Sequence, residues 1–150
     1  METFYQCYLS RLRDLHEDME RAIAGLPQEA LDWVPGPDMN TLAVLVVHIC
    51  GAQRYWLGEV VAGKPSGRDR ETEFRTKALD AGILLQRIHD ALDQAQGVLD
   101  LLSLQDLADV RTSRNNKQVT VGWVLAHVMA HTALHVGHIE LTRQLWSQNH

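Results

Sequence analysis

Apolar residues recur at intervals of three and four in four long stretches of the chain, the spacing that gathers them on one face of an α-helix. The first stretch covers residues 3–25, where the series is Phe4, Tyr8, Leu12, Leu15, Met19 and Ile23. We predict the other three helices over residues 41–61, 73–102 and 120–146. Four amphipathic helices in one small chain predict an all-α fold, a four-helix bundle.

Residues that favour helix ends support these boundaries. Gly25 and Gly63 are each followed closely by proline, and glycine favours the left-handed conformation that ends many helices. Asn40 and Thr41 offer an N-cap to the second helix, and Thr120 offers one to the fourth. The connections leave both an up-down and a crossover topology open.

The segments between the expected helices lack a long apolar period. Residues 27–33 fit one short helical turn, and residues 66–73 are typical of an exposed polar loop. Residues 103–119 are irregular with a turn at 114–117, and two short strands there are not favoured. The length of 150 residues is common for one domain, so we expect a single domain over residues 1–150.

Composition and charge narrow the class of protein. Apolar residues make up 45% and charged residues 22%, the balance of an ordinary soluble protein. A net charge of −5 argues against a nucleic-acid partner, whose phosphates demand a basic surface. We expect no signal peptide, because the first residues are acidic and no apolar run follows them. The most apolar run is too short to span a bilayer, and the two cysteines give no disulfide framework. We therefore expect a reduced, cytoplasmic protein without a membrane partner.

Histidines dominate the fourth predicted helix. His127, His131 and His135 follow one another at four-residue spacing, and His138 lies three residues further on. Counting ~100° per residue, all four fall within an arc of about 80°. The same stripe carries apolar residues and is therefore expected to be buried: Leu134, Leu141 and Leu145. Imidazoles on a buried face are costly unless satisfied, and a bound metal ion is the usual reason to keep them.

A zinc-like site takes about three protein ligands when one position stays open. Two ligands from one helical turn and one from a facing helix build such a site, and His48 lies on the apolar stripe of the second helix. The pair is either His131 with His135 or His127 with His131, and the depth of His48 in the bundle decides between them. A core of histidines bonded only to one another and to the backbone is the metal-free alternative. The other histidines lie on polar or terminal stretches and are expected at the surface: His16, His89 and His150.

Other catalytic motifs are missing. The chain has no H-E-x-x-H, which argues against a metalloprotease, and no Glu-x-x-His pairs of the kind found in di-iron bundles. Cys50 lies about 200° round the helix from His48, counting ~100° per residue, so it points away from the proposed site. We interpret Cys50 as a small buried apolar residue.

Several short motifs, in their order and spacing, resemble the DinB/YfiT-like family of metalloenzymes over nearly the whole chain. The motifs are Leu26-Pro27-x-Glu29-x-Leu31, Trp33, Asn40-Thr41-Leu42, His48 within residues 47–56, and His127-x-x-x-His131-x-x-x-His135-x-Gly137. The resemblance implies a four-helix bundle, often dimeric, that binds a divalent metal through three side chains.

Carried over residue by residue, the resemblance implies that His48, His131 and His135 are the metal ligands. Zinc or nickel is the expected ion, and iron also suits three imidazoles. Many relatives have H-R-G-Q where this chain has His135-Val136-Gly137-His138. The role of the usual arginine and glutamine therefore does not carry over, and His138 becomes a candidate polar group beside the metal ligands.

The wider superfamily includes transferases and isomerases that use mycothiol or bacillithiol. The resemblance therefore implies a metal-dependent enzyme, a low-molecular-weight-thiol-dependent S-transferase that acts on a small-molecule substrate with a thiol cosubstrate and forms a homodimer. One alternative is a hydrolase whose metal activates water. The other is a non-catalytic metal-binding stress-response protein, because a fold and a metal alone do not specify a reaction.

Overall fold

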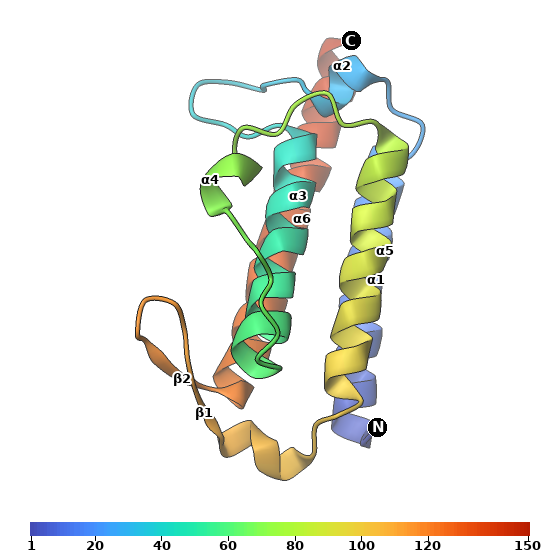
Figure 1. Cartoon of the computed structure of the whole chain (residues 1–150). Coiled ribbons are helices and arrows are strands. Elements are labelled where there is room, and N and C mark those ends of the chain that lie inside the picture. Colours follow the sequence, from blue (N-terminus) through green and yellow to red (C-terminus); the bar gives the residue numbers. More distant parts are fainter.

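The computed structural model describes residues 1–150 and is built around four long helices (Figure 1). They are α1 (Thr3–Ile23), α3 (Leu42–Gln53), α5 (Ala81–Leu99) and α6 (Val121–Asn149). A π-helix, η1 (Arg54–Val61), continues α3 without a break. The predicted four-helix bundle is confirmed. None of these helices combines the length and apolar character that a bilayer crossing requires.

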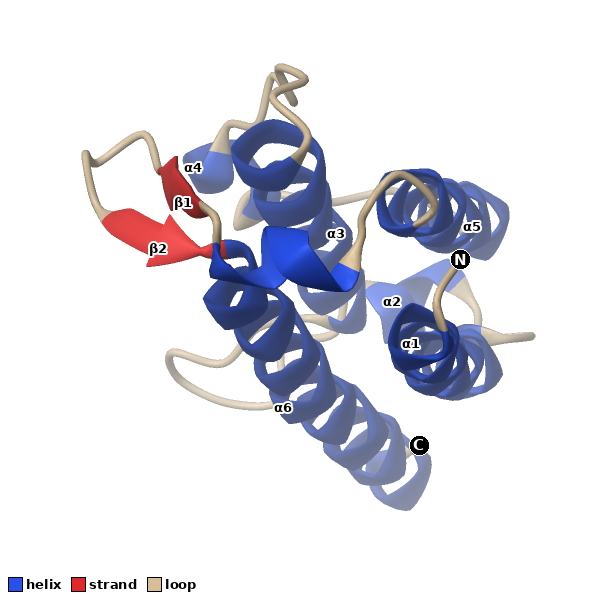
Figure 2. Cartoon of the chain, turned by 90° about the horizontal axis from the view of Figure 1, so that it is seen from below, coloured by secondary structure: helices blue, strands red, loops and turns tan.

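The helices form a crossover bundle. Helix α1 contacts α5 and α6, and α3 contacts the same two, so α1 and α3 lie diagonally opposite each other (Figure 2). Along the bundle, α3 and α5 run in one direction while α1 and α6 run in the other (Figure 1). The connection through α2 (Gln28–Leu31) therefore crosses the end of the bundle, and α3 and α5 are parallel neighbours.

Local chemistry explains where the helices begin and end. The Thr41 hydroxyl accepts a hydrogen bond from the Val44 amide, and Thr120 accepts one from the Trp123 amide, as their predicted N-cap roles require. Gly25 and Gly63 have positive φ angles of 69° and 68° just beyond the ends of α1 and η1, the left-handed geometry predicted for them.

Two predicted elements differ from the structure. The third helix does not start at residue 73, because α4 (Arg70–Glu73) is a separate short helix and the Asp80 carboxylate caps α5 by accepting from the Ile83 amide. The segment 103–119 contains a 3₁₀ helix, η2 (Leu104–Ala108). An antiparallel pair of strands follows, β1 (Val110–Thr112) and β2 (Gln118–Thr120). Strands this short carry too little alternation to be separated from a loop by pattern alone.

The buried face of α6 is rotated away from the expected stripe. Leu134 and Leu141 are 58% and 50% exposed, so the prediction that they are buried is wrong. The residues that face the bundle are Val121, Val124, Leu125, Val128, Thr132, Val136, Ile139 and Thr142. Their centre lies about 80° round the helix from the histidines, counting ~100° per residue. The histidines therefore occupy the border of the buried face, where side chains can reach both the core and solvent.

The prediction that His16 lies at the surface is also wrong. His16 is fully buried between three helices, with Nδ1 3.1 Å from the Ile88 carbonyl oxygen and Nε2 2.9 Å from the Gln53 side-chain oxygen. Gln53 is itself buried and donates to the Ala91 carbonyl. A neutral ring donates to one of these two oxygens and a protonated ring to both, so the histidine is hydrogen-bonded within the core. His89 is exposed as predicted, and it pairs with Glu20.

Candidate metal centre

Three histidines from two helices converge on one point of the bundle. His48 projects from α3, and His131 and His135 project from successive turns of α6. One ring nitrogen of each lies within 4.8 Å of the corresponding nitrogens of the other two. The Nε2 atoms of His48 and His131 are only 3.0 Å apart. The structure thus brings together the three residues that the family resemblance implies as ligands.

His127, the alternative ligand, lies outside this group. Its ring stacks on Trp123 at 4.8 Å between centroids and also packs against Trp56 at 5.0 Å. Its centroid is 5.8 Å from that of His131, whereas the His131 and His135 centroids are 4.5 Å apart. The level of His48 along the bundle therefore favours the pair His131 and His135.

The donor set fits a divalent ion. Nitrogens about 2.0–2.1 Å from a tetrahedral zinc lie roughly 3.4 Å from one another, which is close to the separation of the two Nε2 atoms. Burial, aided by the neighbouring histidines, lowers the pKa of His131 to about 3 and that of His135 to about 4. Both imidazoles are therefore neutral at neutral pH, the form that binds a metal.

Glu73 holds His48 in place, and sequence reasoning missed it. Its Oε1 is 3.0 Å from His48 Nδ1, and the Arg68 guanidinium grips both carboxylate oxygens at 2.7 and 2.8 Å. Burial acts to raise the pKa of Glu73, but the hydrogen bonds from Arg68 and His48 outweigh it and keep the pKa below its usual value. An ionised Glu73 can only accept, so His48 Nδ1 donates to it and Nε2 is left with a free lone pair.

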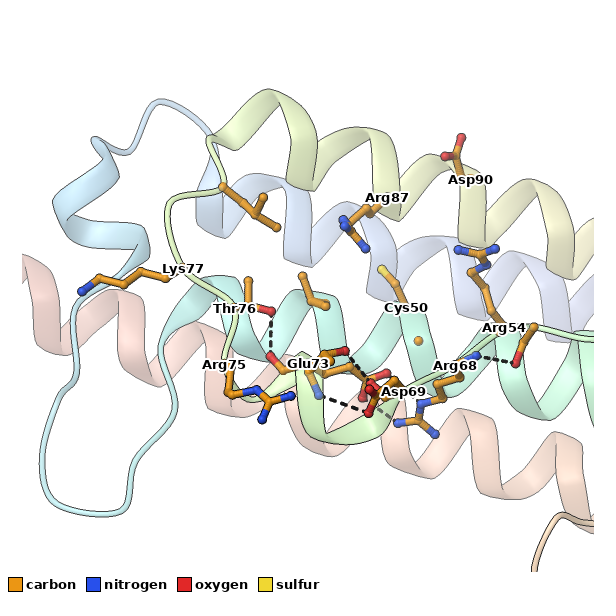
Figure 3. Close-up of a pocket in the computed structure, with 16 residues that line it drawn as sticks. Cys50, Arg54, Arg68, Asp69, Glu73, Arg75, Thr76, Lys77, Arg87 and Asp90 are labelled. Carbon is orange, nitrogen blue, oxygen red and sulfur yellow. Dashed lines mark hydrogen bonds and ion pairs between the residues drawn. The ribbon is translucent and has the colours of Figure 1, made fainter.

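The backbone leaves room for this carboxylate. A Cβ atom on Gly51, one turn along α3 from His48, would lie 2.0 Å from Glu73 Oε2. Figure 3 shows the Arg68–Glu73 pair against α3, in the wall of a cavity of about 470 Å³ that Cys50 also lines. Cys50 is buried and absent from the histidine cavity, as predicted, and burial raises the pKa of its thiol to about 12. In the sequence, only Gly51 in α3 signals that the Glu73 carboxylate approaches this helix closely.

His138 contacts His135. The two Nδ1 atoms are 3.2 Å apart, so a hydrogen bond between them leaves Nε2 of His135 free for the metal centre. His138 is exposed, unlike Glu73. It occupies one of the two positions at which this chain departs from the H-R-G-Q pattern.

The histidines open into a second cavity, of about 860 Å³, which is lined by other residues of α3 than the cavity in Figure 3. Aromatic side chains form much of its wall: Tyr55, Trp56, Phe74 and Trp123. Phe74 packs on His48 at 5.0 Å between ring centroids. A largely preformed, aromatic-walled cavity of this size suits a small-molecule ligand next to the three imidazoles.

The fold is that of the DinB superfamily, and the family model described as mycothiol-S-transferase matches residues 8–148. The chain therefore belongs to the mycothiol-S-transferase family. No curated protein gives a significant sequence match.

Solved structures have the same fold at low sequence identity. A conserved protein from Enterococcus faecalis is 17% identical with a TM-score of 0.78, and the alignment covers 97% of both chains. YfiT from Bacillus subtilis, a probable metal-dependent hydrolase with an unusual four-helix bundle topology, is 13% identical with a TM-score of 0.77, over 96% of this chain and 89% of that one. The mycothiol-dependent maleylpyruvate isomerase is 13% identical with a TM-score of 0.66, over 91% of this chain but only 62% of the isomerase.

Proposed function

We propose that the protein is a divalent-metal-dependent S-transferase that uses a low-molecular-weight thiol. The observation that carries this proposal is the group of three imidazoles, from two helices, at one end of an open aromatic cavity. Membership of the mycothiol-S-transferase family supports a thiol cosubstrate, and the mycothiol-dependent isomerase shares the fold. His48, His131 and His135 are the proposed ligands, and zinc or nickel is the proposed ion.

The residues around the site have distinct parts in this reaction. A divalent cation bound there supplies Lewis acidity, which lowers the pKa of a thiol and favours the thiolate at neutral pH. Glu73 and Arg68 fix the ring of His48, and His138 orients His135. The aromatic wall shields one side of the cavity from water. The sulfur forms a bond to an electrophilic carbon of the substrate, the leaving group departs with the bonding electrons, and the thiol proton passes to solvent.

Metal analysis of tag-free protein tests the site. We expect close to one equivalent of zinc or nickel in the wild type and almost none in a His131→Ala/His135→Ala variant, because two of three ligands are gone. His127→Ala is the matched control, since it removes a histidine from the same helix face, and it should keep its metal. Equal metal contents in the wild type and the double variant would disprove the site.

Turnover tests the reaction. Protein loaded with metal is incubated with mycothiol or bacillithiol and monobromobimane, and the thioether is quantified by fluorescence. We expect conjugation above the uncatalysed rate, and its loss after chelation. Turnover that survives metal removal contradicts a metal-dependent transferase. Ester hydrolysis without thiol transfer would identify a hydrolase, and a metal that only raises the melting temperature would identify a structural site.

A further inference from the structure

The cavity next to the histidines is strongly basic. Four basic side chains line it and no acidic side chain does, although the whole chain carries a net charge of −5. The basic residues are Arg68, Arg70, Arg114 and Lys117. A local excess of one charge inside a concave site attracts ligands of the opposite charge.

Two of these four cations are already neutralised. Arg68 is paired with Glu73, as described above, and Arg114 donates to both oxygens of Glu59 at 2.6 Å. Arg70 and Lys117 form no ion pair. The unbalanced positive charge of the cavity therefore comes from Arg70 and Lys117.

The two unpaired cationic side chains, Arg70 and Lys117, each pack over an aromatic ring in the wall of the cavity. The Arg70 guanidinium carbon lies 4.8 Å from the centroid of Phe74, and the Lys117 Nζ lies 4.1 Å from that of Trp123. Phe74 in turn packs on His48. One cation thus comes from α4 and the other from the loop between β1 and β2, so two separate elements each present a positive charge to the same cavity.

We infer that this cavity selects a carboxylate-bearing ligand, which Arg70 and Lys117 bind while the other end of the molecule faces the histidines. The inference deepens the proposed function. Only the statement that the other end of the ligand faces the histidines rests on that function. A carboxylate neutralises the two cations and accepts charge-assisted hydrogen bonds from both, whereas a neutral ligand leaves them uncompensated. The carboxylate belongs either to the thiol or to its electrophilic partner.

Matched thiols test the selection on the thiol side. Cobalt-substituted protein is titrated with 3-mercaptopropionate and 6-mercaptohexanoate and with the neutral amide of each, and the thiolate-to-cobalt absorption gives Kd. We expect at least one acid to bind about 10-fold more tightly than its amide. In an Arg70→Met/Lys117→Met variant the ratio should fall to about 1. The control is Arg75→Met/Lys77→Met, which removes the same two residue types from the rim of the other cavity and should keep the wild-type ratio.

A dicarboxylate without sulfur tests the electrophile side. Succinate is titrated into metal-free protein and followed by tryptophan fluorescence, because Trp56 and Trp123 line the cavity. Saturable binding that is lost in Arg70→Met/Lys117→Met but retained in the control supports the inference; where the thiols show no acid preference, it assigns the carboxylate to the electrophile. An acid preference among the thiols, lost in the same variant, assigns it to the thiol. Circular dichroism checks that both double variants are folded.

Two results would overturn the inference. One is equal Kd values for acids and amides together with no succinate binding. The other is an acid or succinate affinity that the Arg70→Met/Lys117→Met variant retains as fully as the control does. A cobalt spectrum that no thiol perturbs contradicts the proposed transferase instead, and the succinate titration still decides the carboxylate question independently.

Discussion

At the scale of single residues, Glu73 decides which nitrogen of His48 faces the proposed metal site. We expect Glu73→Gln to weaken zinc affinity about 10- to 100-fold, as the loss of a carboxylate partner does in other histidine-metal sites. The amide keeps the size of the side chain but removes the charge that holds Nδ1 protonated and engages Arg68. Competition with a chromophoric chelator measures the change in Kd.

Glu71 provides the control for this substitution. It lies on the same short helix as Glu73 but is exposed and makes no contact with a histidine. Glu71→Gln should bind zinc like the wild type. If Glu73→Gln also bound zinc with unchanged affinity, the hydrogen bond to His48 Nδ1 would have no role in holding the metal.

Periodicity could find the histidines but not their partners. His131 and His135 share a face because of their four-residue spacing, and His48 lies on the apolar stripe of a facing helix. Glu73 reaches His48 from a separate short helix beyond a loop, and no spacing rule relates the two residues. His16 was misjudged for a similar reason, because the groups that satisfy it come from two other helices.

At the scale of elements, Arg114 joins the β1–β2 hairpin to η1. The hydrogen bonds from Arg114 are the main reason that the pKa of Glu59 is lowered to about 2. A carboxylate whose pKa is lower in the folded state stabilises the fold above its unfolded pKa of about 4.5, and this contribution is lost as the pH falls through about 2. The link between the hairpin and η1 should therefore weaken as the pH falls from about 4.5 to about 2.

The substitution Arg114→Met tests this link. The pKa of Glu59, followed by carboxyl NMR, should rise towards its ordinary value. The stability of the variant should change less than that of the wild type between pH 5 and pH 2, about three units that include the ordinary carboxyl pKa. Arg111→Met serves for comparison, since Arg111 is in the same hairpin but pairs with Asp109. An unchanged Glu59 pKa in Arg114→Met would show that another group lowers it.

Helix boundaries were predictable where a capping side chain begins the helix or a glycine ends it. Thr41, Thr120, Gly25 and Gly63 all act as their residue types suggest. The start of α5 was not, because Ala78 adopts a positive φ of 60°, which interrupts an apolar series that looks continuous in the sequence. Such a break depends on contacts outside the segment, including the Asp32 carboxylate, which accepts from the Ala78 amide.

At the scale of the whole molecule, the crossover could not be read from the pattern of the helices. The amphipathic pattern shows that each helix has a buried face, but it does not show which neighbouring helix covers that face. The diagonal placement of α1 and α3 makes α3 and α5 parallel neighbours, and this leaves a long connection that carries Arg68 and Glu73 to the site. The homodimer stays a prediction, which a solution mass at micromolar concentration can test.

His16 links three helices of the bundle and makes its stability depend on pH. Burial is the main cause that lowers the pKa of His16, and it outweighs the hydrogen bonds to the Gln53 and Ile88 oxygens, which act to raise it. Because the folded pKa lies below the unfolded value of about 6.5, the unfolded chain binds a proton that the folded chain does not. The free energy of unfolding should therefore be greatest above pH 6.5 and should fall as the pH drops below it.

Replacing His16 by a group that does not titrate should remove its share of this dependence. We expect His16→Gln in metal-free protein to be less stable than the wild type at pH 8, because the buried hydrogen bonds are imperfectly replaced. The variant should nevertheless lose less stability than the wild type between pH 6.5 and pH 5, a window set by the ordinary histidine pKa. Urea unfolding at each pH measures both effects.

His89→Gln makes the same change at an exposed site and should follow the wild-type curve. The pH dependence that remains in His16→Gln then reports His131 and His135, whose pKa values are also lowered by burial. Parallel curves for His16→Gln and the wild type would mean that protonation of His16 does not oppose folding.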